Sequence, residues 1–148
     1  MTVIRRATLA DGAAAIQTLR RSIIELCVAD HHNDAEELEP WLRNKTLENW
    51  AKWVAMDDAV LLVADRDGAV VGVGSTTLQG MILLNYVHPE ARFSGVSKAL
   101  LAALEAALLQ RGVRQCRLQS TLTARAFYAA CGYRVEGDGE TFVKDLGE

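Results

Sequence analysis

The residues best placed to do chemistry lie in the segment 86–98, where an apolar run meets a polar loop and then an Ala/Leu-rich stretch. The run from Met81 to Val87 predicts a buried strand, and Pro89 ends it because proline cannot donate to a sheet ladder. Gly95 allows a turn with positive φ and a close approach of a ligand to the backbone. A helix starting at about residue 96 then presents free N–H groups and the positive end of its dipole. The segment therefore predicts a phosphate-type anion site that needs no metal.

The spacing in this loop is Arg92-x-x-Gly95-x-Ser97, which matches neither G-x-x-x-x-G-K-[ST] nor G-x-G-x-x-G. It resembles the acyl-CoA pyrophosphate loop of the GNAT superfamily of N-acyltransferases, Q/R-x-x-G-x-G/A, and the preceding Tyr-Val-His-Pro-Glu resembles the usual lead-in of that family. Ser97 stands where the family has Gly or Ala; serine is small, and its hydroxyl can donate to a phosphate. Taken alone, the loop is equally compatible with an ordinary surface loop that contains one glycine.

A second segment supports the same family. After Gly112, a predicted helix C-cap, residues 115–119 alternate like a strand with Cys116 and Leu118 on one face. The stretch 124–133 then reads A-R-A-F-Y-A-A-C-G-Y, which resembles the GNAT signature A-x-x-F-Y-x-x-x-G-F/Y at the expected distance downstream. The matching tyrosine, Tyr128, lies beside the sulfur of bound CoA in that family. The resemblance implies an α+β fold in which a mixed, mostly antiparallel sheet is flanked by helices, as a single domain over residues 1–148.

The resemblance also implies an activity: transfer of an acetyl group from acetyl-CoA, as co-substrate and without a metal, to a primary amine by direct attack in a ternary complex. The strand end would splay from its neighbour and expose the backbone to the pantetheine arm, and the N–H of Val87 would polarise the thioester. Tyr128 would protonate the departing thiolate, since a phenol with a pKa near 10 is a suitable donor. The cofactor-binding residues implied in this way are Asn85, Tyr86, Val87, Arg92, Phe93, Ser94, Gly95, Val96, Ser97, Lys98 and Tyr128.

No general base is evident. Many GNAT relatives use a glutamate or a bound water on the strand before the loop, but residues 81–87 contain no carboxylate. Glu25, Asp30, His31 and His32 lie in the helical region that usually walls the acceptor site. His31 has a suitable ordinary pKa, and the alternative is a solvated loop histidine. The His31-His32 pair lacks further ligands at metal spacing, so we expect no metal there.

The expected elements can be placed by residue range. Strands are predicted at 3–6, 59–66, 69–77, 81–87 and 115–119, with two more near the C-terminus joined by a turn at Asp138-Gly139. Asp67-Gly68 predicts a tight hairpin between the second and third strands. Thr8-x-x-Asp11 predicts the start of a first helix, and two further helices follow residues 34 and 46. The three tryptophans lie in this helical region and read as core or helix packing, with an acceptor cage as the alternative: Trp41, Trp50 and Trp53.

Composition limits the functional class. The chain has 148 residues, 50% of them apolar, which fits one globular domain. The formal charge of −3 argues against a broad nucleic-acid surface, and no apolar run is long enough to predict a membrane span. The cysteines Cys27, Cys116 and Cys131 are scattered and no signal peptide precedes them, so we expect reduced thiols and a cytoplasmic location.

The acceptor stays open among amino acids, polyamines, aminoglycosides, peptide N-termini and lysine side chains, as do a longer acyl group and a homodimer. The alternative function is a GNAT-fold module that binds acyl-CoA without turnover, or a partner subunit. Dead members of the family commonly lose the tyrosine or the loop glycine, whereas Tyr128 and Gly95 are both present here. An unrelated α+β protein that binds a nucleotide at Gly95 would leave the Phe127-Tyr128 segment unexplained.

Overall fold

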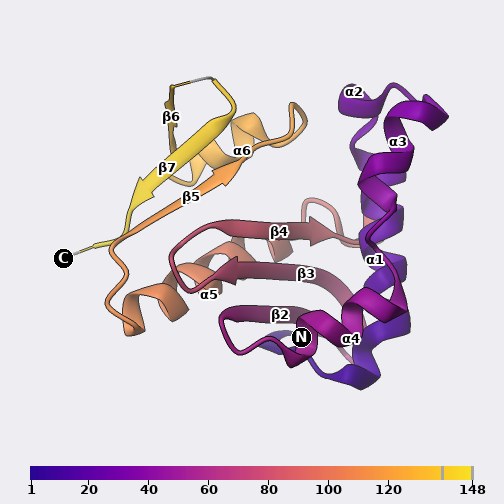
Figure 1. Cartoon of the computed structure of the whole chain (residues 1–148), viewed down its shortest axis with the longest axis horizontal. Helices are drawn as coiled ribbons and strands as arrows, with labels where there is room; N and C mark the ends of the chain where they lie inside the picture. Colours follow the sequence, from indigo (N-terminus) through magenta and orange to yellow (C-terminus); the bar gives the residue numbers. More distant parts are fainter. Residues whose placement is uncertain (138, 148) are drawn as a thin grey trace.

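The computed structural model describes residues 1–137 and 139–147, and its order of elements confirms the α+β prediction (Figure 1). Short 3₁₀ turns at Leu9–Asp11 and Pro89–Ala91 precede α1 and the loop before α5. The other elements in chain order are β1 (Thr2–Arg6), α1 (Gly12–Leu26), α2 (Val28–His31), α3 (Ala35–Leu42), α4 (Leu47–Ala55), β2 (Ala59–Arg66), β3 (Ala69–Thr77), β4 (Ile82–Val87), α5 (Val96–Gln110), β5 (Gln115–Gln119), α6 (Arg125–Ala130), β6 (Arg134–Glu136) and β7 (Thr141–Asp145).

The strands form two antiparallel sheets, in the orders β1-β2-β3-β4 and β5-β7-β6. One isolated parallel bridge, between Met81 and Arg117, joins them. Beyond this bridge β4 and β5 run apart, as Figure 1 shows. The expected mixed sheet is therefore divided between β4 and β5, and the predicted splay of the β4 end is confirmed.

Turn residues set the strand boundaries that sequence could predict. Asp67 and Gly68 adopt φ values of 53° and 93° and join β2 to β3, so both strands have the predicted bounds. Strand β5 also has its predicted bounds. The predicted Asp138-Gly139 turn cannot be compared in full, since Asp138 lies outside the described residues.

Helices α1 and α5 cover opposite faces of the four-stranded sheet. Alternate residues of β2 show this: Val63 packs in the cluster that contains Leu19 of α1, whereas Ala64 packs in the cluster that contains Leu100 of α5. On β3, a Cβ at Gly72 would lie 2.7 Å from Leu100 Cδ1. Glycine at this position therefore lets α5 lie directly against the sheet.

The tryptophans pack among helices, as predicted. Trp50 is 1% exposed, and its Nε1 donates to the carbonyl of Thr8 at 3.0 Å. Trp53 packs edge-on against Trp50, with ring centroids 6.3 Å apart, and Trp41 packs in the same way against His31. All three cysteines are free thiols. Among the described residues no helix has the length and apolar character needed to cross a membrane.

One partly buried ion pair fixes the start of α1 to the edge of the sheet. Arg5 on β1 donates two hydrogen bonds to the carboxylate of Asp11, at 2.8 and 2.9 Å, and a third to Asp65 on β2 at 3.1 Å. Asp11 also accepts from the N–H of Thr8 at 2.8 Å, which completes the predicted start of the helix. These bonds, chiefly those from Arg5, lower the pKa of Asp11 to about 2.

Replacing Asp11 with Asn should lower the free energy of unfolding at pH 7 by about 1.5–3 kcal/mol, the usual contribution of hydrogen bonds to a charged group. Because the folded-state pKa of Asp11 is depressed, the wild-type advantage should be complete above about pH 4 and vanish as pH falls through about 2. Urea denaturation across this range measures both effects. Glu39→Gln, which removes an exposed pair with Arg43, is the control and should change stability by less than about 1 kcal/mol. Equal losses in the two variants would contradict the assignment.

Candidate active site

The open edge of β4 carries backbone groups that have no strand to pair with. The N–H of His88 donates to the carbonyl of Val71 on the β3 side, at 2.8 Å. Because N–H groups alternate in direction along a strand, those of Asn85 and Val87 point away from β3, toward the edge from which β5 diverges. The N–H that sequence assigned to thioester polarisation therefore faces open space.

The two faces of β4 lead to two different surroundings. Leu84 and Tyr86 pack on the α1 side of the sheet, whereas Val87 packs on the α5 side. By strand alternation Asn85 shares the α5 side with Val87. The slot between the diverging strands β4 and β5 therefore connects the face of the sheet that α1 covers with the face that α5 covers.

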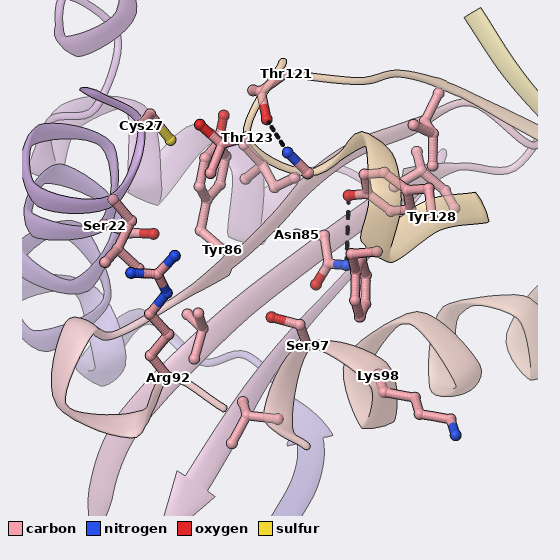
Figure 2. Close-up of a pocket in the computed structure, with 18 of the residues that line it drawn as sticks. Ser22, Cys27, Asn85, Tyr86, Arg92, Ser97, Lys98, Thr121, Thr123 and Tyr128 are labelled. Carbon is pink, nitrogen blue, oxygen red and sulfur yellow. Dashed lines mark hydrogen bonds between the residues drawn. The ribbon is translucent and has the colours of Figure 1, made fainter. Parts of the chain in front are cut away.

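A cavity of about 520 Å³ fills this slot. It extends from Ser22 on α1 and from Cys27, which follows that helix, past the edge of β4 to the loop before α5 and to α6 (Figure 2). Of the predicted cofactor residues, all but Ser94 line it. Ser94 instead lies under the loop, where its hydroxyl donates to the carbonyl of Ala91 and accepts from Arg66.

The α5 end of the cavity has the form of an anion site. Gly95 caps the helix with φ +83°, and no side chain accepts from the first turn, so the first N–H groups of the helix are open. A Cβ at Gly95 would meet no protein atom within 4 Å. The exposed side chain of Lys98 lies at this end. Phe93, which is 91% exposed at φ +63°, forms the outer edge of the loop.

Tyr128 lies in the middle of the cavity, opposite β4. It is 7% exposed, and its ring packs edge-on between Phe127 and Tyr133. Desolvation is the main cause that raises its pKa to about 12, although the hydrogen bond from Asn85 acts in the opposite direction. Tyr128 therefore keeps its proton at neutral pH.

Asn85 is the polar residue that faces Tyr128 across the slot. Its Nδ2 donates to the Tyr128 hydroxyl at 3.5 Å, whereas its Oδ1 is buried and has no partner among the described residues. An unpartnered buried acceptor has lost its hydration without replacement, so a donor on a bound molecule would restore the missing bond.

The α1 end of the cavity is apolar with a few polar groups. Burial raises the pKa of the Cys27 thiol to about 11, so the thiol stays protonated, and burial likewise raises the pKa of Tyr86 above its usual value. Figure 2 shows the guanidinium of Arg92 turned toward Ser22 on α1. The loop position of Arg92 alone could not predict this direction.

His31 is neither a cavity base nor a solvated loop histidine. It is fully buried; its Nε2 donates to the carbonyl of Ile23 at 2.8 Å, and its Nδ1 accepts from the N–H of Asn33 at 3.1 Å. Both ring nitrogens are thus used in holding the turn after α2 against α1. His32 is exposed and pairs with Glu37.

The two carboxylates proposed from sequence also lie outside the cavity lining. Glu25 pairs with Arg21 at 2.7 Å on the surface of α1. Asp30 accepts from the N–H of Leu122 at 2.6 Å and from the hydroxyl of Thr123 at 2.8 Å, so it ties α2 to the loop before α6. No carboxylate or imidazole is present among the described residues that line the cavity. The described residues also include no group of three or more His, Cys, Asp or Glu side chains that could hold a metal.

The loop before α6 holds itself together with its hydroxyls. Ser120 donates to the carbonyl of Thr121 at 2.7 Å, and the Thr121 hydroxyl accepts from the N–H of Ala124 at 3.1 Å. Thr121 also lines the cavity.

Comparison with known proteins agrees with this geometry. The family model described as an acetyltransferase (GNAT) domain matches residues 17–145. The chain belongs to the GNAT family. No curated protein matches the chain. Solved structures share its fold.

Three solved structures illustrate the similarity. The PaiA N-acetyltransferase of Thermoplasma acidophilum, in complex with coenzyme A, is 23% identical with a TM-score of 0.87 over 98% of this chain and 99% of that one. A GCN5-related N-acetyltransferase of Rhodopseudomonas palustris is 25% identical with a TM-score of 0.86, over 99% and 96%. A ribosomal-protein-alanine N-acetyltransferase of Brucella melitensis is 24% identical with a TM-score of 0.70, over 97% and 99%.

Proposed function

We propose that this GNAT protein transfers an acetyl group from acetyl-CoA to a primary amine by direct attack within a ternary complex. One observation carries the proposal: a single cavity joins an anion site at the start of α5 to a buried, protonated Tyr128 beside the unpaired edge of β4. Coenzyme A in the Thermoplasma structure supports an acyl-CoA ligand.

The two sides of the slot suit two substrates. The N–H groups from Phe93 to Lys98 would bind the pyrophosphate on the α5 side, and the pantetheine arm would lie between β4 and β5 along Asn85 and Val87. The acceptor would come from the α1 side, past Cys27 and Tyr86. Both substrates would then meet at the β4 edge in one orientation, which is the main catalytic contribution open to such a site.

The chemical step uses few groups. The amine nitrogen forms a bond to the thioester carbon, and the oxyanion accepts a hydrogen bond from the N–H of Val87. The C–S bond then breaks, and the thiolate takes the proton of the Tyr128 hydroxyl. The hydrogen bond from Asn85 stabilises the resulting phenolate. The amine nitrogen loses its extra proton to solvent, and the Tyr128 phenolate takes a proton back from solvent.

A covalent acetyl-cysteine intermediate is disfavoured. Cys27 is the cysteine that lines the cavity, and with a pKa of about 11 its thiol is almost entirely un-ionised at neutral pH. Because the thiolate is the nucleophilic form, Cys27 is a poor acetyl carrier. Direct attack by the amine is therefore the simpler route.

The proposal is tested by incubating the protein with acetyl-CoA and a panel of amines and following release of free thiol. Acetylation of at least one amine class with turnover supports it. Acetyl-CoA that raises the melting temperature without acetylation of any amine would favour the alternative, a binding module or partner subunit.

Replacing Gly95 with Ala should weaken acetyl-CoA binding by about tenfold or more, because a Cβ at the cap faces the phosphate site and opposes the positive φ. Gly112→Ala is the matched control: Gly112 ends α5 at φ +78°, also with nothing within 4 Å. Both variants should lose about 1–2 kcal/mol of stability from backbone strain. Calorimetric titration should show weakened acetyl-CoA binding in Gly95→Ala alone. Equal acetyl-CoA affinities in the two variants would contradict the assignment of an anion site to the start of α5.

Replacing Tyr128 with Phe should lower kcat by about 10²–10⁴-fold while leaving acetyl-CoA affinity nearly unchanged, since the hydroxyl acts as charge develops on sulfur. Tyr133→Phe removes a neighbouring hydroxyl, which donates to Glu105 at 2.7 Å outside the cavity lining. This control should lose stability and keep its kcat. Steady-state and single-turnover rates measure both variants, and an unchanged chemical rate in Tyr128→Phe would show that another group protonates the thiolate.

The kcat/KM of the wild type should increase with pH and should not decrease again on the alkaline side. A pKa of about 12 keeps the acid form of Tyr128 dominant up to about pH 11. With no carboxylate or imidazole among the described lining residues, kcat/KM should rise through the acceptor amine's own pKa and then level off. Rates measured with two acceptors of different amine pKa give the check. A rising limb at the same pH for both acceptors would instead reveal an enzyme base.

A further inference from the structure

The described cavity lining contains two ionisable cations and no anion. Arg92 and Lys98 flank the loop before α5, and Figure 2 shows their side chains pointing in opposite directions: Lys98 toward the α5 side, Arg92 toward Ser22 on α1. The two charges therefore serve different ends of the cavity, although Arg92 in the loop and Lys98 in the first turn of α5 are only six positions apart.

Arg92 is exposed, and its guanidinium contacts one aromatic ring. Its Cζ lies 4.5 Å from the centroid of the exposed Phe93 ring, a cation–π contact. No hydrogen bond or ion pair to this guanidinium is formed within the described part of the chain. It is close enough to Cys27 to lower the pKa of that thiol, against the larger effect of burial. The charge thus reaches the α1 end of the cavity.

The chemistry of this end selects against polycations. An acceptor with a second ammonium would meet Arg92 and no carboxylate among the described lining residues, since Glu25 and Asp30 are engaged elsewhere. Like charges at short range repel. A planar guanidinium with a free fork of donors is instead matched to a carboxylate.

We propose that the acceptor is an amine that also carries a carboxylate, and that Arg92 binds this carboxylate on the α1 side of the slot. The proposal rests on the acetyl transfer proposed above and names the substrate class. The hydroxyl of Ser22, which lies beside the guanidinium in Figure 2 and has no hydrogen-bond partner among the described side chains, can donate to the same group. Apolar lining from Leu26 and Leu84 suits an acceptor with an apolar body.

The competing source of the anion is the cofactor. The sequence resemblance assigned Arg92 to the loop that binds the CoA pyrophosphate. If its side chain binds the pyrophosphate, removing that side chain should weaken acetyl-CoA binding. The two assignments predict different losses of affinity, so Arg92→Met and Lys98→Met form a matched pair: each removes one cation from the cavity lining.

The experiment uses L-amino acids and the carboxamides of the same residues as paired acceptors, with spermidine added to the panel and thiol release as readout. Wild type should prefer the amino acids, although the carboxylate raises the pKa of its own amine and leaves less of it neutral. Arg92→Met should raise the KM for the amino acids about tenfold or more and leave that for the carboxamides nearly unchanged. Arg92→Lys, which keeps the charge but not the fork, should fall between.

Acetyl-CoA affinity, measured by calorimetry, should be unchanged in Arg92→Met and reduced in Lys98→Met. A reduced acetyl-CoA affinity in Arg92→Met, or wild-type preference for carboxamides or spermidine, would overturn the carboxylate assignment while the acetyl transfer stands. Absence of acetylation of every amine in the panel would count against the transferase itself.

Discussion

The unpaired edge of β4 is the constraint on which the site depends. A sheet normally satisfies the N–H and C=O groups of each inner strand from both sides, but β5 contacts β4 at one bridge, between Met81 and Arg117, and then pairs with β7 instead. The N–H groups of Asn85 and Val87 are left facing a cavity. Their unsatisfied hydrogen-bonding capacity, together with the orphan Oδ1 of Asn85, is what a bound amide or thioester would fill.

Contacts across the slot and at its flank join the elements around it. Tyr128 packs into the cluster that includes Phe142 of β7 and reaches back to Asn85 across the slot. On the far side, the carboxylate of Asp30 on α2 holds the loop before α6, so the helical region after α1 is joined to the segment that carries Tyr128. The electrostatics of the slot follow from burial: Tyr128 and Cys27 keep their protons, and no carboxylate is found among the described lining residues.

Sequence predicted the parts of this arrangement that local chemistry determines. Asp67-Gly68 fixed the β2–β3 hairpin, and Gly95 predicted a positive-φ helix cap in the right place. The role of His31 could not be predicted, because its burial depends on left-handed turn residues at 32 and 33 that fold the ring back onto α1. The direction of Arg92 depends on where α1 lies relative to the loop, and the tie made by Asp30 joins residues 92 positions apart. Neither contact can be predicted from the spacing of residues along the chain.

A crystal structure of the protein with coenzyme A bound tests the central claim most directly. The account predicts the pantetheine arm between β4 and β5, its sulfur within hydrogen-bonding reach of the Tyr128 hydroxyl, and the pyrophosphate on the N–H groups that follow Phe93. Coenzyme A bound anywhere else, or bound with its sulfur remote from both Tyr128 and the N–H of Val87, would contradict it.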